Sequence, residues 1–167
     1  TRVGTCEWMI NSAGKLTVRP LGNGVSGKMD YNFGGTLGGA PWSSQSESIT
    51  SAVFEPGVST NWTAYMFSGC ENLATVDFSE LDTSRVADMK SMFSSCSSLT
   101  SLDLTPLDTS NVTDMTRMFA NCTNLTSIDF SGFNTAQVKR MESMFVGCEK
   151  LGALDLSSFD TSNVTTM

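Results

Sequence analysis

The sequence predicts an α/β repeat fold, a solenoid of stacked coils with parallel strands and short helical turns, preceded by an N-terminal β-hairpin cap. Two observations predict it. One motif recurs four times at a constant spacing, and within each copy the apolar spacing changes from a helical to a strand-like period. Constant register over four copies indicates that each copy is one coil stacked on the next, because such a unit cannot bury its apolar face alone.

The repeated motif reads Met-Phe-x-x-Cys-x-x-Leu, followed by an apolar-Asp-apolar triplet. Its cysteines mark a constant period of 26, since they are Cys70, Cys96, Cys122 and Cys148. Apolar residues first recur three to four positions apart, as at Val86, Met89 and Phe93, which predicts a short helical turn. They then alternate with polar residues at Leu102 and Leu104, which predicts a strand.

A polar corner follows each predicted strand. The corner sequence is Asp-Thr-Ser in three copies and Asn-Thr-Ala in one; the first residues are Asp82, Asp108, Asn134 and Asp160. The side chain of Asp or Asn can accept a hydrogen bond from its own backbone two residues on. We therefore expect an Asx-turn at every corner.

The predicted cap covers residues 1–48. Its first twenty residues predict a β-hairpin, because Cys6 and Trp8 alternate with polar neighbours and Leu16 and Val18 resume the alternation after a Gly-containing turn. We expect Cys6 to be a small core residue of this cap.

Residues 21–48 are rich in Gly and Ser and predict an irregular segment, with Trp42 as the anchor that fixes it to the first coil. The predicted solenoid covers residues 49–167 and opens with a degenerate coil. Three apolar residues of that coil match the next coil at an offset of 24; they are Ile49, Ala52 and Phe54, against Leu73, Val76 and Phe78.

Composition excludes several classes of function. A net charge of −7 and a pI near 4.4 argue against a nucleic-acid or anionic-membrane partner, because both require a basic patch. The absence of His excludes His-based nucleophile systems and His-ligated metals. No apolar run approaches the roughly 18 residues of a membrane helix, so we expect no direct membrane insertion, and we expect no cofactor.

The four motif cysteines predict a column of free, buried thiols. Neighbouring coils of a stack lie about 4.8 Å apart with parallel side-chain vectors. A disulfide requires closer Cβ atoms, at about 3.5–4.5 Å, on inclined vectors. The repeat therefore argues against a disulfide framework.

The repeat resembles a known family. The segment Phe-x-x-Cys-x-x-Leu-x-x-Leu-Asp-Leu, with the corner Asp-Thr-Ser-Asn-Val-Thr, is similar to the BspA-like leucine-rich repeats of bacterial surface proteins. The likeness covers about residues 49–167. It implies a leucine-rich-repeat solenoid, display on the outside of a bacterium with signal and anchor outside this segment, and binding or adhesion in place of catalysis. It offers no catalytic residue, so we expect no enzyme.

The candidate partner-binding face combines a predicted column of outward carboxylates with two aromatic residues. The column contains Asp77, Asp103, Asp129 and Asp155, and the aromatic residues are Trp62 and Tyr65. A solvated acidic stripe is the simplest interpretation of the column. The alternatives are a weak Ca²⁺ site, for which one column supplies few oxygens, a dock for a basic partner, and a carboxylate pair of the glycosidase type.

Two functions follow from these patterns. One is a binding or adhesion module that contacts a protein on a host or neighbouring cell, and the other is a passive stalk or spacer that displays other domains. Because Met167 stands where a further motif would begin, we also expect the uncovered last coil to allow end-to-end self-association.

Overall fold

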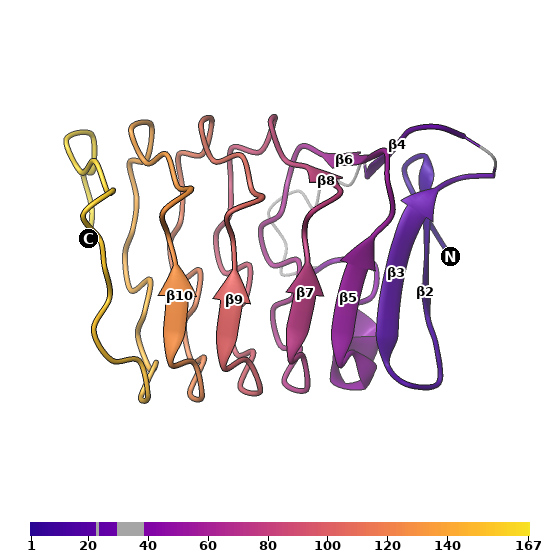
Figure 1. Ribbon diagram of the computed structural model, residues 1–167, viewed down its shortest axis with the longest axis horizontal. Coiled ribbons are helices and arrows are strands. Elements are labelled where there is room, and N and C mark those ends of the chain that lie inside the picture. The colour runs from indigo at the N-terminus through magenta and orange to yellow at the C-terminus, as the bar shows by residue number, and fades with distance from the viewer. Residues whose placement is uncertain (23, 30–38) are drawn as a thin grey trace.

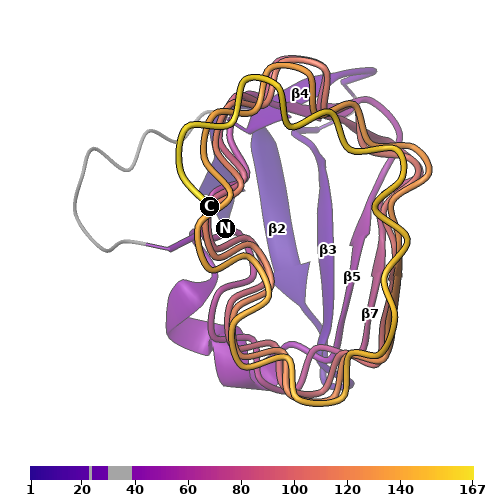
Figure 2. The ribbon, with the colours of Figure 1, turned by 90° about the vertical axis from the view of Figure 1, so that its left-hand side faces the viewer.

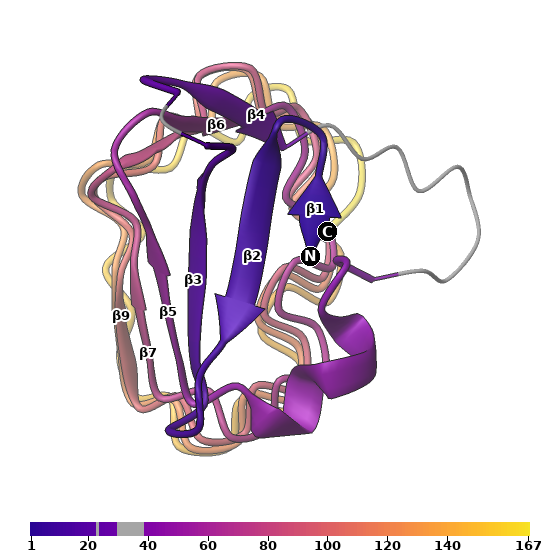
Figure 3. The ribbon, with the colours of Figure 1, turned by 90° about the vertical axis from the view of Figure 1, so that its right-hand side faces the viewer.

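The structure, a computed structural model, describes residues 1–22, 24–29 and 39–167. The chain winds into coils that stack along the long axis of the molecule, with the N-terminal strands at one end and the last residues at the other (Figure 1). Seen from either end, the coils superpose into one outline around a common interior (Figures 2 and 3).

One wall of the stack carries most of the strands and is called the strand wall. Its strands are β2 (Cys6–Ile10), β3 (Lys15–Pro20), β5 (Ser51–Phe54), β7 (Thr75–Asp77), β9 (Ser101–Asp103) and β10 (Ser127–Asp129), and β1 (Arg2–Val3) pairs with the outer edge of β2. The pairs β1–β2 and β2–β3 are antiparallel, so the predicted hairpin is confirmed. From β3 onward the ladders are parallel, as β3–β5, β5–β7 and β9–β10.

The register of the parallel strands follows the repeat. Leu102 in β9 lies opposite Ile128 in β10, an offset equal to the period that the motif cysteines mark. Ala52 in β5 lies opposite Val76 in β7, the shorter offset expected for the degenerate first coil. Each repeat is therefore one coil of the stack.

A smaller parallel sheet occupies the neighbouring corner. It contains β4 (Gly27–Met29), β6 (Val58–Thr60) and β8 (Leu81–Asp82). Farther along each coil, single parallel bridges join four successive repeat positions; these are Asp88, Asp114, Arg140 and Thr166. Backbone pairing thus joins the coils at several points around the outline.

The predicted helical turns are wrong. The one helix among the described residues is the 3₁₀ helix η1 (Ser43–Ser48) in the cap region. No helix in the described part of the chain is long and apolar enough to cross a membrane. The reason lies in two left-handed positions in every coil, one directly before the Met-Phe-x-x-Cys motif and one at its fourth residue. The first has φ between 53° and 58° at Tyr65, Ser91, Arg117 and Ser143, and the second has φ between 61° and 74° at Gly69, Ser95, Asn121 and Gly147. A right-handed helix needs negative φ throughout, so these segments form successive turns and the class is strand and turn rather than α/β.

The interior is one continuous apolar cluster formed from repeat columns. A column of phenylalanines stacks face to face, with ring centroids 5.7, 5.6 and 5.8 Å apart; its members are Phe67, Phe93, Phe119 and Phe145. Met, Leu and Val columns fill the rest, and burying each large side chain stabilises the fold by roughly 1.5–3 kcal/mol. The cap and the coils share this cluster.

Trp42 fixes the cap to the first coil, as predicted. Its ring is fully buried between Trp8 and Phe67, with centroids 6.0 and 6.2 Å away. Its indole Nε1–H donates to the carbonyl of Met66 at 2.9 Å. The segment around it is more ordered than predicted, because β4 and η1 lie within it; residues 23 and 30–38 of that prediction lie outside the described residues.

The predicted free thiols are confirmed. Cys70, Cys96, Cys122 and Cys148 form no disulfide; the first three are buried, as is Cys6, and Cys148 is partly buried. Three thiols of the column donate to a phenylalanine carbonyl of the preceding coil: Cys96 to Phe67 at 3.1 Å, Cys122 to Phe93 at 3.1 Å and Cys148 to Phe119 at 3.0 Å. Burial raises the pKa of Cys122 to about 12, so the interior holds neutral thiols.

Candidate functional site

The strand-wall carboxylates lie where each strand ends. Asp77, Asp103 and Asp129 are the last residues of β7, β9 and β10, and their side chains are exposed. Asp155 holds the equivalent position in the last coil and is also exposed. In β9 and β10 the pair Asp103 and Asp129 lies directly opposite, so the predicted column is present on the wall.

Each of these carboxylates also closes a local turn. Its Oδ1 accepts the backbone N–H two residues on, from Ser79, Thr105, Ser131 and Ser157, at 2.9–3.0 Å. Every corner position does the same, including Asn134, whose Oδ1 accepts the N–H of Ala136 at 3.1 Å. The predicted Asx-turns are confirmed, and a second set stands at the strand ends.

These hydrogen bonds lower the pKa values of three strand-wall carboxylates, which are Asp77, Asp129 and Asp155. The backbone N–H of Ser79 is the main cause that lowers the pKa of Asp77, and that of Ser131 lowers the pKa of Asp129. These three carboxylates are therefore ionised at neutral and mildly acidic pH.

The side chains of the wall enclose shallow hollows. One of about 400 Å³ lies between β9 and β10 and is lined by Asp103, Asp129 and Thr105 among others. Another of about 200 Å³ follows it, between Asp129 and Asp155. Polar groups and the edges of partly buried apolar residues such as Ile128 share these hollows, which gives a contacting chain both hydrogen-bond partners and apolar surface.

Cations are missing from the same part of each regular coil. Residues 75–84, 101–110, 127–136 and 153–162 contain no Lys or Arg. They contain eight acidic residues, which are Asp77, Glu80, Asp82, Asp103, Asp108, Asp129, Asp155 and Asp160. A surface of one sign selects partners of the opposite sign and accelerates their encounter.

The Ca²⁺ alternative finds no geometric basis. No group of three or more His, Cys, Asp or Glu residues within 1–22, 24–29 and 39–167 could hold a metal ion. The four strand-wall carboxylates, Asp77, Asp103, Asp129 and Asp155, form a line in which each is committed to its own turn. A line of single oxygens does not enclose a cation that needs six to eight ligands.

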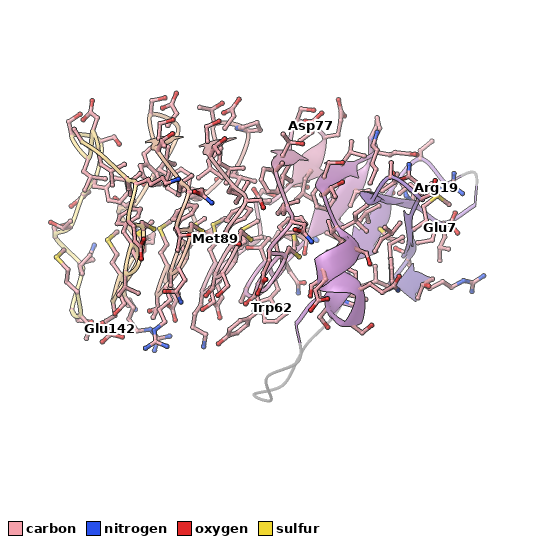
Figure 4. The ribbon with its side chains drawn as sticks, turned by 90° about the horizontal axis from the view of Figure 1, so that it is seen from below. Glu7, Arg19, Trp62, Asp77, Met89 and Glu142 are labelled. Atoms are coloured by element: carbon pink, nitrogen blue, oxygen red, sulfur yellow. The ribbon has the colours of Figure 1, made fainter. Side chains whose placement is uncertain are left out.

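The two aromatic residues do not belong to the same face. Trp62 lies on the side of the stack opposite Asp77 (Figure 4), because about half a coil separates them. Tyr65 is half-buried at a left-handed position, and the Nζ of Lys90 lies 5.4 Å from its ring centroid, within the range of a cation–π contact. The prediction of a single face is therefore wrong for Trp62, which lies on another surface than the Asp column.

A buried threonine column was missed from sequence. At three corners the residue after Asp or Asn is buried, namely Thr83, Thr109 and Thr135, whereas Thr161 of the last corner is exposed. The hydroxyl of Thr109 donates to the carbonyl of Asn134 at 3.1 Å and accepts the N–H of Asn134 at 2.8 Å, which ties one coil to the next. The constant Thr after each corner Asp or Asn was the available signal.

One ion pair with a buried carboxylate was also missed. Asp114 is almost fully buried, its Oδ1 accepts the N–H of Thr116, and its Oδ2 lies 2.8 Å from the guanidinium of Arg140 in the next coil. Both residues hold the same repeat position, and no sequence signal distinguishes this pair from exposed charges at that position.

The strand wall supports contact rather than proton transfer. Acid–base catalysis needs two groups whose pKa values are pushed apart. Hydrogen bonds lower the pKa values of Asp77, Asp129 and Asp155 alike. The main cause is the backbone N–H of Ser79 for Asp77 and that of Ser131 for Asp129, whereas for Asp155 it is the side chain of Ser157. Such a row can bind a cationic surface and does not divide into an acid and a base.

Comparison with known proteins gives a family and a pair of weak structural likenesses. The family described as "Mycoplasma protein of unknown function, DUF285" matches residues 61–167. The chain matches no curated protein.

Two solved structures resemble the chain. One is a leucine-rich cell surface protein from Faecalibacterium prausnitzii A2-165, with 18% identity over 99% of this chain and 55% of that one, at a TM-score of 0.37. The other is a leucine-rich-repeat protein from Bacteroides ovatus ATCC 8483, with 15% identity over 92% of this chain and 46% of that one, at a TM-score of 0.47. The chain spans about half the length of these two proteins.

Proposed function

Because this chain belongs to the DUF285 family, whose description states no function, its role must be inferred from its surface, and we propose that it is a non-catalytic binding module of a bacterial cell surface. It acts through protein–protein contacts on the strand wall. Its partner is a protein on a host or neighbouring cell that presents basic residues. The resemblance of the repeat to BspA-like leucine-rich repeats supports the extracellular location and the adhesive role.

The observation that carries the proposal is the charge of the strand wall. Eight acidic residues and no Lys or Arg lie in the strand and corner segments of the regular coils. The repeat spaces the column carboxylates at about the 4.8 Å distance between neighbouring strands. At about 5 Å the mutual repulsion costs under about 1 kcal/mol in water but roughly 3 kcal/mol at an effective dielectric near 20. A partner that covers the wall must therefore supply cations, which makes the surface selective.

Adhesion of coated beads tests the proposal. Fluorescent beads carrying the chain are incubated with epithelial cells and with unrelated bacteria, with and without prior trypsin treatment of the cells. We expect saturable adhesion that trypsin removes. The double variant Asp103→Asn/Asp129→Asn should weaken it by about two- to thirtyfold, since each solvated charge pair contributes about 0.2–1 kcal/mol.

The variant is chosen to change charge without changing the turn. Asn134 already closes a corner turn with its amide oxygen, so Asn at positions 103 and 129 can accept the same N–H. The matched control is Glu142→Gln/Glu149→Gln, which removes two charges from exposed residues outside the strand and corner segments. Equal loss of adhesion in both double variants would show that net charge, and not the strand wall, is responsible.

The alternative function is a passive stalk that displays other domains. Low charge on the rest of the coils, abundant Ser and Thr, and continuous coil-to-coil bonding suit a spacer. The bead experiment separates the two, because a spacer gives no adhesion above that of beads coated with an unrelated protein.

A further inference from the structure

The side of the stack opposite the strand wall has the opposite charge balance. Glu142 lies on that side, away from Asp77 (Figure 4). Equivalent positions of successive coils lie side by side there, because parallel bridges join them. We call the solvent-accessible side chains of residues 87–91, 113–117 and 139–143 the return face. Its cations are Lys90, Arg117, Lys139 and Arg140.

The three acidic residues of the same segments contribute less charge to the surface. Asp114 is almost fully buried and lies 2.8 Å from the guanidinium of Arg140. Asp88 is half-buried, and its Oδ1 accepts the N–H of Lys90 at 2.9 Å. Only Glu142 among them is exposed. The strand and corner segments of the regular coils hold eight of the seventeen acidic residues and none of the ten cations, so the chain has two faces of opposite sign.

We propose that the strand wall of one copy of this chain binds the return face of a second copy, so that coil stacks associate side by side. The proposal rests on the proposed function in one respect, since it takes the strand wall as the binding surface. It goes further by naming the partner. The protein with basic residues on a neighbouring cell is then another copy of this chain.

The spacing of the charges selects a second copy. The column carboxylates belong to successive coils, about 4.8 Å apart. The cations also come from successive coils, with Lys90 in the first, Arg117 in the second, and Lys139 and Arg140 in the third. Their long side chains accommodate the differences in repeat position. A helix repeats one face every 5.4 Å or so, about one turn, and a strand about every 6.6 Å. Neither stays in step with the wall over several coils, whereas a second stack has the same period.

The contact is heterologous, because two different surfaces of the chain meet. Each associated copy keeps a free strand wall or a free return face, so association continues in an open row unless the rotation between copies closes a ring. The net charge of −7 opposes association. At about 0.1 M salt, however, charges farther apart than about 10 Å are largely screened, while charges that face each other across the contact still attract.

Two double variants, studied alone and mixed, test the inference by analytical ultracentrifugation. The wall variant is Asp103→Asn/Asp129→Asn. The return variant is Arg117→Gln/Lys139→Gln, which changes two exposed side chains and keeps Arg140, the partner of buried Asp114. The matched control is Arg2→Gln/Lys150→Gln, which removes the same charge from exposed residues outside the return face.

We expect the natural chain to form species of increasing size at low salt and to dissociate at about 1 M salt, where the screening length falls to about 3 Å. The association constant of each variant alone should fall by about two- to thirtyfold, as for two solvated charge pairs. Repulsion between net charges alone would instead strengthen association of the wall variant, which is less negative. An equal mixture should regain the natural affinity but form mainly dimers, because one variant keeps its return face and the other its strand wall.

A natural chain that sediments as a monomer at low salt would overturn the inference. Equal association of all variants would also overturn it, since the contact would then lie at the ends of the stack. So would a mixture without recovery, or a loss in the control equal to that of the return variant.

The bead assay keeps the two proposals separate. Adhesion to other cells that needs the strand wall, together with a monomeric chain, would support the proposed function and overturn this inference. Recovery in the mixture, without adhesion of beads to other cells, would support this inference and contradict binding to a host protein.

Discussion

At the scale of single residues, each coil is shaped by side chains and backbone torsions that reverse the chain without a helix. Asp and Asn close turns with their own oxygens at the strand ends and corners. Two left-handed positions in every coil redirect the Met-Phe-x-x-Cys segment, and non-glycine residues occupy most of them, as Ser95 and Asn121 do. Left-handed torsions strain residues that have a Cβ, so these positions hold part of the energetic cost of the fold.

The pair Gly69→Ala and Gly152→Ala isolates that strain. A Cβ at either glycine would meet no atom within 4 Å, but Gly69 has φ +74° and Gly152 has no left-handed torsion. We expect Gly69→Ala to lower the free energy of unfolding by about 1–2 kcal/mol and Gly152→Ala to change it by less than about 0.5 kcal/mol. Urea unfolding measures both, and equal effects of the two variants would show that the left-handed backbone is not strained.

Acid should destabilise the protein through its turn carboxylates. Hydrogen bonding, chiefly from the backbone N–H of Ser131, lowers the pKa of Asp129 in the folded chain, while the unfolded chain keeps the ordinary value of about 4. The stabilisation is complete above that ordinary value and is lost as pH falls through the lower folded pKa, because the unfolded chain binds the proton first.

We expect the urea midpoint of Asp129→Asn to depend less on pH than that of the natural chain between about pH 6 and about pH 2. The amide retains the turn but cannot titrate. Identical curves for the natural chain and for Asp129→Asn would remove the turn carboxylate from the account of acid stability.

At the scale of the structural element, the coil is defined by columns that bond to the same column in the next coil. The corner threonines join coils by reciprocal bonds between a hydroxyl and a backbone amide, and the thiols donate to phenylalanine carbonyls. These columns satisfy polar groups that the stack buries, which is necessary because an unpaired buried polar group costs about 1–3 kcal/mol.

Thr109→Val tests the threonine column. The variant keeps the shape but leaves the N–H and carbonyl of Asn134 without their hydroxyl partner, so the free energy of unfolding should fall by about 1–3 kcal/mol. Thr109→Ser should recover most of the loss, because it restores the hydroxyl. Thr100→Val, at an exposed position, should have little effect; a loss there equal to that of Thr109→Val would attribute the effect to valine itself.

The thiol column should be unreactive while the fold is intact. Burial raises the pKa of Cys70 to about 12 and also raises that of Cys148, which is only partly buried. A thiol reagent at neutral pH should therefore modify Cys148 first and reach all five cysteines only after denaturation. Rapid modification of Cys96 in the native protein, located by mass spectrometry, would contradict its burial.

At the scale of the whole molecule, the repeat period predicted the architecture and the local torsions limited the prediction. Constant spacing of Cys70, Cys96 and their equivalents was sufficient to predict parallel coils and free thiols, because spacing reports register directly. The helical turns were predicted wrongly because buried residues three and four apart occur in successive turns as well as in helices. Positive φ values distinguish successive turns from a helix, and a Ser or Arg in the sequence does not indicate that its φ is positive.

The candidate site was predicted in part for a related reason. The Asp column follows from strand alternation, which fixes the face that each residue occupies. Placing Trp62 on that face required the path of the coil between it and Asp77, and no periodic pattern specifies that path (Figure 4). The ion pair between buried Asp114 and exposed Arg140 breaks the repeat chemistry at one position, so the repeat could not predict it.

The most direct test of the coil stack is residue-resolved hydrogen exchange of the whole chain. The account predicts slow exchange that recurs with the period of the repeat, at Phe67, Phe93 and Phe119, whose amides donate to the next coil. It predicts fast exchange at Phe145, which holds the same repeat position but has no described acceptor. Protection without this period, or protection of Phe145 equal to that of Phe119 in the isolated protein, would contradict a stack in which these amides donate to the following coil.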